Sequence, residues 1–169
     1  MMFEGKRTRF EALVRAYSTE LYRYAYWLCR DRFTAEDLVQ ETFARAWGNL
    51  GSLREEHAAK AWLYTILRNE HARLHERMRL PLVDDHDLDS IVDHRLGGMH
   101  AALEMREALH ALPAAYREAL LLQVLGGFSC EEIAQMMQLS TGAVMTRLSR
   151  ARLALRRQPG LAGGEEAVA

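Results

Sequence analysis

Apolar residues recur every three or four positions along most of this chain, which is the spacing of amphipathic α-helices. The pattern predicts helices over residues 10–28, 34–47, 57–79, 99–112, 114–125, 130–137 and 141–157. No stretch alternates apolar and polar residues as a half-buried strand does, so the predicted fold is all-α. Ser18 is able to cap a new helix start, so the first segment is predicted as either one helix or two.

The last two predicted helices are short, and a tight polar turn joins them. Ser129 precedes the first, and Glu132 follows three residues later, which is the spacing of a capping box. Ser140 opens the second helix in the same way. Their apolar stripes consist of Ile133, Ala134 and Met137 in one helix and Val144, Leu148, Ala151 and Leu155 in the other. Two capped helices with facing apolar stripes indicate a helix-turn-helix.

The second of these helices carries five arginines and no acidic residue. At about 100° per residue, Thr146, Ser149 and Arg150 lie opposite the apolar stripe, and Arg147 and Arg152 flank them. Short polar side chains beside an arginine suit base edges, and flanking arginines suit phosphates. A solvated basic helix end is the alternative, because cations are favourable near a helix C-terminus. The capped partner helix favours DNA recognition.

The predicted helix at 34–47 separates apolar from polar side chains. Thr34 and the acids that follow it predict its N-cap. Its buried side is predicted to consist of Leu38, Val39, Phe43, Ala46 and Trp47. The opposite side carries Asp37, Gln40, Glu41 and Arg45. These polar residues fit a solvated face, a docking surface or a catalytic pair. Catalysis is the least favoured reading, because no nucleophile or metal-ligand set accompanies the acids.

The long helix at 57–79 carries a second, weaker basic face. Its basic residues are Lys60, Arg68, Arg73, Arg77 and Arg79, against Glu70 and Glu76. Its apolar stripe is predicted to consist of Trp62, Ile66 and Leu67. His71 and His75 are four residues apart, a spacing that can chelate zinc. No third ligand is near them in sequence, so we expect solvated histidines and no metal site.

Composition and charge indicate the domain organisation. Residues 1–80 and 99–157 are predicted as two small helical domains joined by an acidic linker at 81–98, with a disordered tail at 158–169. The formal net charge of −1 argues against a general nucleic-acid coat, so DNA contact must come from local basic faces. The N-terminus lacks the apolar core of a signal peptide, and the two cysteines suggest no disulfide framework. We therefore expect a cytoplasmic protein.

Four motifs in both halves of the chain resemble one family. They lie at residues 35–43, 61–69, 112–118 and 132–152, and the resemblance covers nearly everything from Phe10 to Arg157. In order and spacing they resemble the bacterial RNA polymerase sigma factors of the small extracytoplasmic-function (ECF) group. A lone helix-turn-helix would be a weak signal, whereas the same motif preceded by the two N-terminal ones is a strong one.

The resemblance implies specific partners and sites. Core RNA polymerase would bind through Asp37, Gln40 and Glu41. Residues 48–56 and the following helix would open the −10 promoter element and capture a flipped base, with contacts from Lys60, Arg68, Asn69, Arg73 and Arg77. The −35 element would be read by Thr141, Met145, Thr146, Arg147, Ser149, Arg150 and Arg152. It also implies an anti-sigma factor as regulator and no cofactor, metal, catalytic residue or small-molecule substrate.

Two departures and three alternatives accompany this interpretation. The family commonly has lysine or arginine at Met145, and its basic helix end is diluted here by His75, Glu76 and Met78. A helix-turn-helix regulator that is not a polymerase subunit explains the C-terminal half alone. A sigma-like decoy that binds an anti-sigma factor is the second alternative, although decoys usually carry a receiver domain. A helical metal-dependent hydrolase using His71 and His75 is the third.

Overall fold

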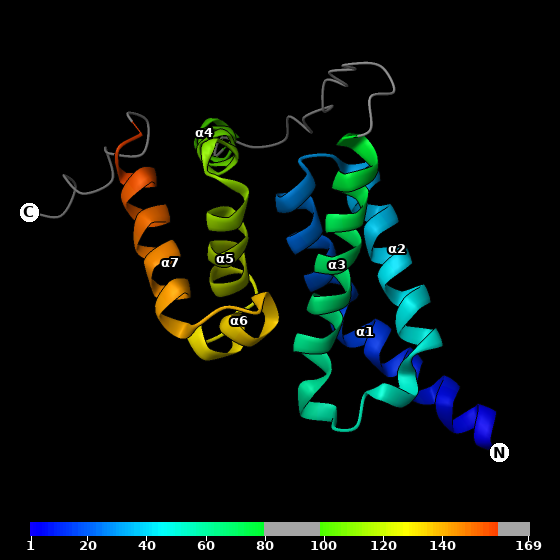
Figure 1. Cartoon of the computed structure of the whole chain (residues 1–169). Helices are drawn as coiled ribbons and strands as arrows, with labels where there is room; N and C mark the ends of the chain where they lie inside the picture. The colour runs from blue at the N-terminus through cyan, green and yellow to red at the C-terminus, as the bar shows by residue number, and fades with distance from the viewer. Residues whose placement is uncertain (80–98, 159–169) are drawn as a thin grey trace, which may run out of the picture. The chain divides into compact units, whose positions relative to one another are not determined.

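The computed structural model of this chain describes residues 1–79 and 99–158 (Figure 1). Over these residues it consists of seven α-helices and two short 3₁₀ helices, with no strand, which confirms the all-α prediction. The helices form two compact units, one from each half of the chain. The predicted linker at 81–98 and residues 159–169 of the predicted tail lie outside the described residues.

The first unit packs three long helices against one another. They are α1 (Met2–Cys29), α2 (Arg32–Gly48) and α3 (Ala59–Arg79). α1 is one continuous helix, which decides the choice left open at Ser18. Buried residues lie on both sides of that serine, so packing along the whole helix outweighs the local tendency of serine to start a new one.

The start of α2 differs from the prediction. Asp31, and not Thr34, is the N-cap, and its carboxylate accepts the backbone N–H of Thr34 at 2.9 Å. The Thr34 hydroxyl also donates to this carboxylate, and that bond lowers the pKa of Asp31. Threonine is a favoured N-cap residue, but so is aspartate. Because Asp31 caps the helix, Thr34 lies inside its first turn.

The buried side of α2 is largely as predicted. Leu38, Phe43 and Ala46 are buried, whereas Val39 is only half-buried. Trp47 was wrongly placed in the core, because 37% of it is exposed. Its ring lies at the surface, where it packs edge-on against Phe10 with a centroid distance of 5.1 Å. The Lys6 ammonium lies 4.5 Å from the centroid of the same ring.

The segment between α2 and α3 is short and well packed. It contains η1 (Leu50–Ser52) and η2 (Glu56–Ala58), so α3 begins at Ala59, two residues later than predicted. Leu50 and Leu53 are buried in a small cluster that Trp62 partly covers. Arg9 of α1 fixes this segment by donating to the Leu53 carbonyl at 2.8 Å.

The apolar stripe of α3 is shifted by about one position from the prediction. Leu63, Tyr64 and Leu67 are fully buried, whereas Trp62 and Ile66 are half-buried. α3 contacts both α1 and α2, so its buried surface is wider than a single stripe. Periodicity alone does not distinguish large apolar residues at the edge of that surface, such as Trp62 and Ile66, from residues at its centre.

The second unit contains four shorter helices. They are α4 (Met99–Ala111), α5 (Ala114–Val124), α6 (Cys130–Met137) and α7 (Thr141–Arg156). Gly127, which follows α5, has a φ of 69°, and this left-handed backbone conformation favours glycine. At Gly126 a Cβ atom would lie 2.6 Å from the Leu122 carbonyl oxygen, so no larger residue fits this turn. The two glycines thus explain how the chain reverses between α5 and α6.

The helix-turn-helix prediction is confirmed in its details. Ser129 and Glu132 form the complete capping box of α6, with distances of 2.8 Å and 3.2 Å. The Ser140 hydroxyl accepts the backbone N–H of Ala143 at 3.1 Å and caps α7. Gln138 forms the turn in the left-handed conformation, with a φ of 55°. The predicted stripes are buried, except that Leu155 is half-buried.

Candidate functional site

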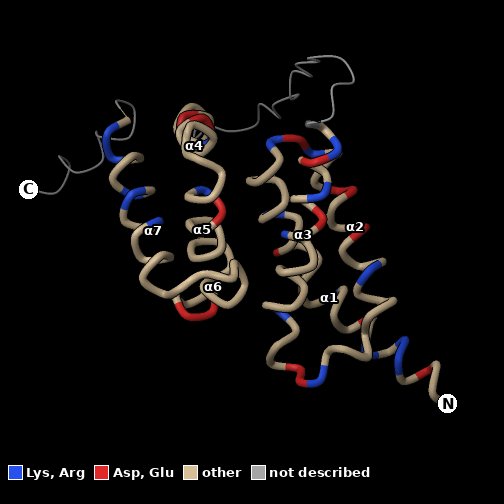
Figure 2. Tube along the Cα trace, viewed as in Figure 1, with Lys and Arg blue, Asp and Glu red and all other residues tan. Residues whose placement is uncertain are grey.

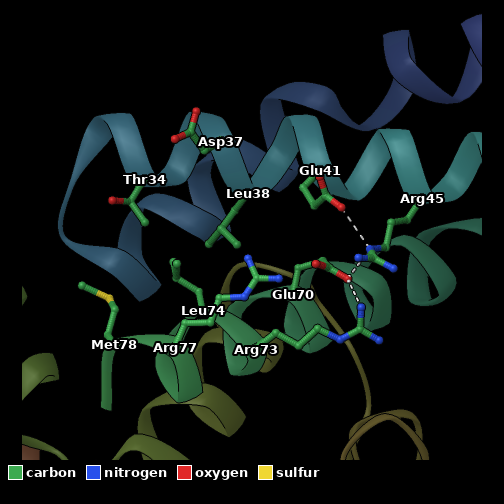
Figure 3. Close-up of a pocket in the computed structure, with 10 residues that line it drawn as sticks. All are labelled: Thr34, Asp37, Leu38, Glu41, Arg45, Glu70, Arg73, Leu74, Arg77 and Met78. Carbon is green, nitrogen blue, oxygen red and sulfur yellow. Dashed lines mark hydrogen bonds and ion pairs between the residues drawn. The ribbon is translucent and has the colours of Figure 1, made fainter. Parts of the chain in front are cut away.

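The outer face of α2 carries the first group of candidate residues. Asp37, Gln40 and Glu41 are all exposed, as the periodicity predicted. Figure 3 shows the Asp37 carboxylate pointing away from α3, whereas Glu41 points toward Arg45. The Glu41 carboxylate lies 3.0 Å from the Arg45 guanidinium one turn along the helix. The face therefore offers an exposed carboxylate, an exposed amide and an acid that is already in an ion pair.

An open groove of about 500 Å³ lies between α2 and α3 beside this face (Figure 3). Leu38, Leu74 and Met78 contribute its apolar lining. Its charged lining consists of Asp37, Glu41, Arg45, Glu70, Arg73 and Arg77. The groove thus combines an apolar surface with both signs of charge, which is the chemistry of a protein-docking surface.

Glu70 organises the charges of this groove. Only 8% of its side chain is exposed, and its carboxylate lies 2.6 Å from Arg45 of α2 and 3.1 Å from Arg73 of α3. A buried carboxylate is costly unless cations surround it, so the three side chains act as one unit that ties α2 to α3. This role of Glu70 was not predicted from the sequence. The i, i+3 spacing of Glu70 and Arg73 was its only visible signal.

The five residues predicted for the −10 element do not lie on one face. Arg73 and Arg77 line the groove beside α2, as Figure 3 shows. Lys60 faces α1, where its ammonium lies 2.6 Å from the Glu20 carboxylate. The remaining two, Arg68 and Asn69, are half-buried and exposed, respectively. The periodicity places Asn69 on the side of α3 away from its buried residues.

Glu20 also has a neutral partner. The Tyr64 hydroxyl donates to its carboxylate at 3.1 Å. Burial raises the pKa of Tyr64, and the nearby Glu20 carboxylate adds to the shift. Tyr64 therefore stays protonated as a hydrogen-bond donor. The Lys60–Glu20–Tyr64 cluster fixes the start of α3 against α1.

The face of α7 opposite its buried stripe carries the second group of candidates. Figure 2 shows that α7 contains Lys or Arg positions and no Asp or Glu. Thr146, Ser149, Arg150 and Arg152 are exposed, and Thr141 and Arg147 are half-buried. Met145 is 57% exposed, which is unusual for an apolar side chain and places its thioether among these polar groups. The exposures agree with the predicted face of a recognition helix.

Three of these side chains already have partners within the unit. The Thr146 hydroxyl donates to the Gly142 carbonyl at 3.0 Å. Arg150 Nη1 donates to the Tyr116 hydroxyl of α5 at 3.2 Å. Arg152 donates to the side-chain carbonyl of Gln123, also on α5. Helix α5 therefore supports Arg150 and Arg152 of α7, a role that was not predicted from the sequence.

No metal centre is formed by the residues that the structure describes. Among residues 1–79 and 99–158, no group of three histidine, cysteine or acidic side chains is placed to hold an ion. His71 and His75 pack ring against ring, with centroids 4.5 Å apart. Burial raises the pKa of the Cys29 thiol to about 12, so this thiol is unreactive. Nor is any helix in the described part of the chain long and apolar enough to span a membrane.

A capped helix-turn-helix with arginines on its outward face defines this chain as a helix-turn-helix DNA-binding protein. Two family matches refine that class, because Sigma-70 region 2 matches residues 13–79 and Sigma-70 region 4 matches residues 102–155. The chain belongs to the ECF group of RNA polymerase sigma factors, whose members direct the polymerase to promoters.

Individual relatives support this membership. The chain is 37% identical over 121 residues to the ECF RNA polymerase sigma factor EcfG of Rhodopseudomonas palustris, covering 70% of this chain and 67% of the relative. It is 30% identical over 154 residues to the ECF sigma factor SigM of Mycobacterium tuberculosis, covering 90% of this chain and 78% of the relative.

Two solved structures are similar as well. The sigma factor RpoE of Bartonella quintana, solved with the anti-sigma factor NepR, has a TM-score of 0.67 and 30% identity, covering 89% of this chain and 93% of its own. CnrH, solved with the cytosolic domain of CnrY, has a TM-score of 0.66 and 26% identity, covering 88% and 86%. The likeness thus extends across both units of this chain.

Proposed function

We propose that this chain binds core RNA polymerase and directs it to promoters by contacting the −10 element with its first unit and the −35 element with its second. The observation that carries the proposal is the chemistry of the two exposed faces. The α2 face is acidic and amide-bearing, whereas the α7 face bears arginines and hydroxyls. The first suits a protein partner, and the second suits DNA.

Polymerase binding is assigned to Asp37, Gln40 and Glu41, which lie on one exposed side of a helix. The Arg45–Glu70–Arg73 unit supports this role, because it fixes α2 on α3 and so presents the three side chains on a rigid scaffold. The adjoining groove would extend the contact with apolar surface.

Promoter opening is assigned to the segment at 48–56, to the half-buried Arg68 and to the exposed Asn69. The amide of Asn69 is able to hydrogen-bond a base edge, and Arg68 is able to contact the backbone. Lys60, Arg73 and Arg77 are kept as phosphate contacts. Lys60 and Arg73 would first have to exchange an internal carboxylate for a phosphate.

Recognition of the −35 element is assigned to α7 in the major groove. Thr146, Ser149 and Arg150 would face base edges, while Thr141, Arg147 and Arg152 would contact phosphates. Met145 would meet the DNA with an apolar side chain, which suits a thymine methyl group better than a phosphate.

Further assignments follow from the same proposal. The domains would comprise residues 1–80 and 99–157, separated by the acidic linker, and the chain would act in the cytoplasm. An anti-sigma factor would regulate it, a role supported by the similar structure of RpoE in complex with the anti-sigma factor NepR. The polymerase would supply all of the chemistry, so no cofactor, metal or small-molecule substrate is assigned to this chain.

A transcription assay tests the central claim. The purified chain is added to core RNA polymerase with promoter fragments, and promoter-dependent initiation is expected. Replacing Asp37 and Gln40 together with alanine should abolish initiation without unfolding the chain, because both side chains are exposed. Glu76→Ala, an exposed acid on α3, is the matched control. Specific DNA binding by the chain alone, with no initiation, would instead indicate a regulator that is not a polymerase subunit.

A further inference from the structure

The hydrogen bond between Arg150 and Tyr116 joins the outward face of α7 to α5. Arg150 Nη1 donates to the Tyr116 hydroxyl oxygen at 3.2 Å, across 34 positions of sequence. The Arg150 side chain is otherwise exposed. A guanidinium has five N–H donors, so one bond from Nη1 leaves the others available to a base.

Tyr116 lies on a rigid part of the second unit. It is in the first turn of α5, where its backbone N–H donates to the Pro113 carbonyl at 2.9 Å. Its neighbour Arg117 donates to the carbonyls of Leu109, His110 and Leu112 at the end of α4, at 2.9–3.0 Å. The ring of Tyr116 is half-buried and has few rotatable bonds, so its hydroxyl is a fixed acceptor.

We propose that Tyr116 is a positioning residue for −35 recognition, because it orients the Arg150 guanidinium before DNA is bound. This inference rests on the proposed role of Arg150 as a base-reading side chain. A long, exposed arginine loses rotamer freedom when it binds a base. The Tyr116 hydroxyl restricts that freedom during folding, so less of it is lost on DNA binding.

The neighbouring pair on the same two helices provides a matched control. Gln123 accepts a hydrogen bond from Arg152, which is assigned to a phosphate. Orientation matters for a base contact, because the donors must match one pattern of acceptors. A phosphate offers acceptors in many directions. Loss of the Tyr116 hydroxyl should therefore change sequence preference, whereas loss of the Gln123 acceptor should not.

The experiment uses the full chain bound to core RNA polymerase and a pool of promoter fragments randomised across the −35 element. Sequencing the bound fraction gives the base preference at each position. Arg150→Ala identifies the position that this arginine reads. Tyr116→Phe should weaken the preference at that position by about three- to tenfold and leave the other positions unchanged. The double variant should lose no more than Arg150→Ala, and Gln123→Leu should keep every preference.

The outcomes separate the two claims. If Arg150→Ala changes no preference, the proposed base-reading role is wrong. If Arg150→Ala removes a preference that Tyr116→Phe retains, the positioning role alone is wrong. Equal weakening at every position by Tyr116→Phe, together with a lower melting temperature, would show that the tyrosine only stabilises the unit and would also overturn the inference.

Discussion

The cations of α3 and those of α7 have partners of different charge. On α3, the Lys60 ammonium lies 2.6 Å from the half-buried Glu20 carboxylate. The Arg73 guanidinium lies 3.1 Å from the buried Glu70 carboxylate. Arg150 and Arg152 of α7 instead donate to the uncharged oxygens of Tyr116 and Gln123. A cation that is paired with a carboxylate must exchange one anion for another when it binds phosphate. The charge of a cation held by a neutral acceptor is not offset by a nearby anion.

This difference explains how a chain with a formal net charge of −1 is able to bind DNA. Counting basic residues makes the two helices look similar. Their partners show that Lys60 and Arg73 belong to the ion pairs that support the packing of α3, while Arg150 and Arg152 are positioned by uncharged groups. The electrostatic attraction to DNA should therefore be concentrated in the second unit.

The largest expected effect concerns the buried acid of the first unit. Glu70→Gln removes the charge that Arg45 and Arg73 share but keeps the shape of the side chain. We expect the free energy of unfolding of the first unit to fall by about 1–3 kcal/mol, because the ion pair with Arg45 is lost and the charge-assisted hydrogen bond from Arg73 weakens. Urea denaturation measures the change. Glu76→Gln, on the exposed side of the same helix, should have almost no effect, and equal losses in the two variants would contradict the structural role of Glu70.

A smaller effect separates the two sets of cations directly. Arg152→Ala should reduce the slope of log binding constant against log salt concentration by about 0.9, as expected for the loss of one phosphate contact. Arg73→Ala should reduce it by clearly less, because this arginine is already paired with Glu70. Promoter binding by the holoenzyme at several salt concentrations gives both slopes. If the slopes fall equally, the distinction between the two helices is incorrect.

The smallest expected effect is a gain of affinity at Met145. This side chain is 57% exposed on the face assigned to DNA, where the family commonly has a cation. Met145→Arg should strengthen promoter binding by about 0.2–1 kcal/mol, the typical contribution of one exposed ionic contact. Met145→Leu, which adds no charge, should leave the affinity unchanged. Weaker binding by the arginine variant would indicate that Met145 makes an apolar contact of its own.

Local patterns in the sequence predicted much of the fold. The helix-turn-helix was found because its capping box and apolar stripes join residues three or four positions apart, and its polar face followed from the same periodicity. The N-cap of α2 was misplaced because Asp31 and Thr34 are both suitable caps three residues apart. Trp47 was misplaced because periodicity indicates on which side of the helix a residue lies but not how deeply its side chain is buried.

The features that could not be predicted join distant parts of the chain. Glu70 is 25 positions from Arg45, and Tyr116 is 34 positions from Arg150. Each pair forms only after helices pack, so neither leaves a repeating signal in the sequence. From the sequence alone, Arg45 could be assigned only to a polar helix face. No contact between α5 and the arginines of α7 could be predicted.

The buried thiol of Cys29 has a practical consequence for experiments on this chain. Burial raises its pKa to about 12, so the thiol carries very little of the reactive thiolate at pH 8. Cys130 begins α6 and is only half-buried. A maleimide dye should therefore attach selectively to the first residue of the helix-turn-helix, and so provide a fluorescent reporter without any cysteine being removed.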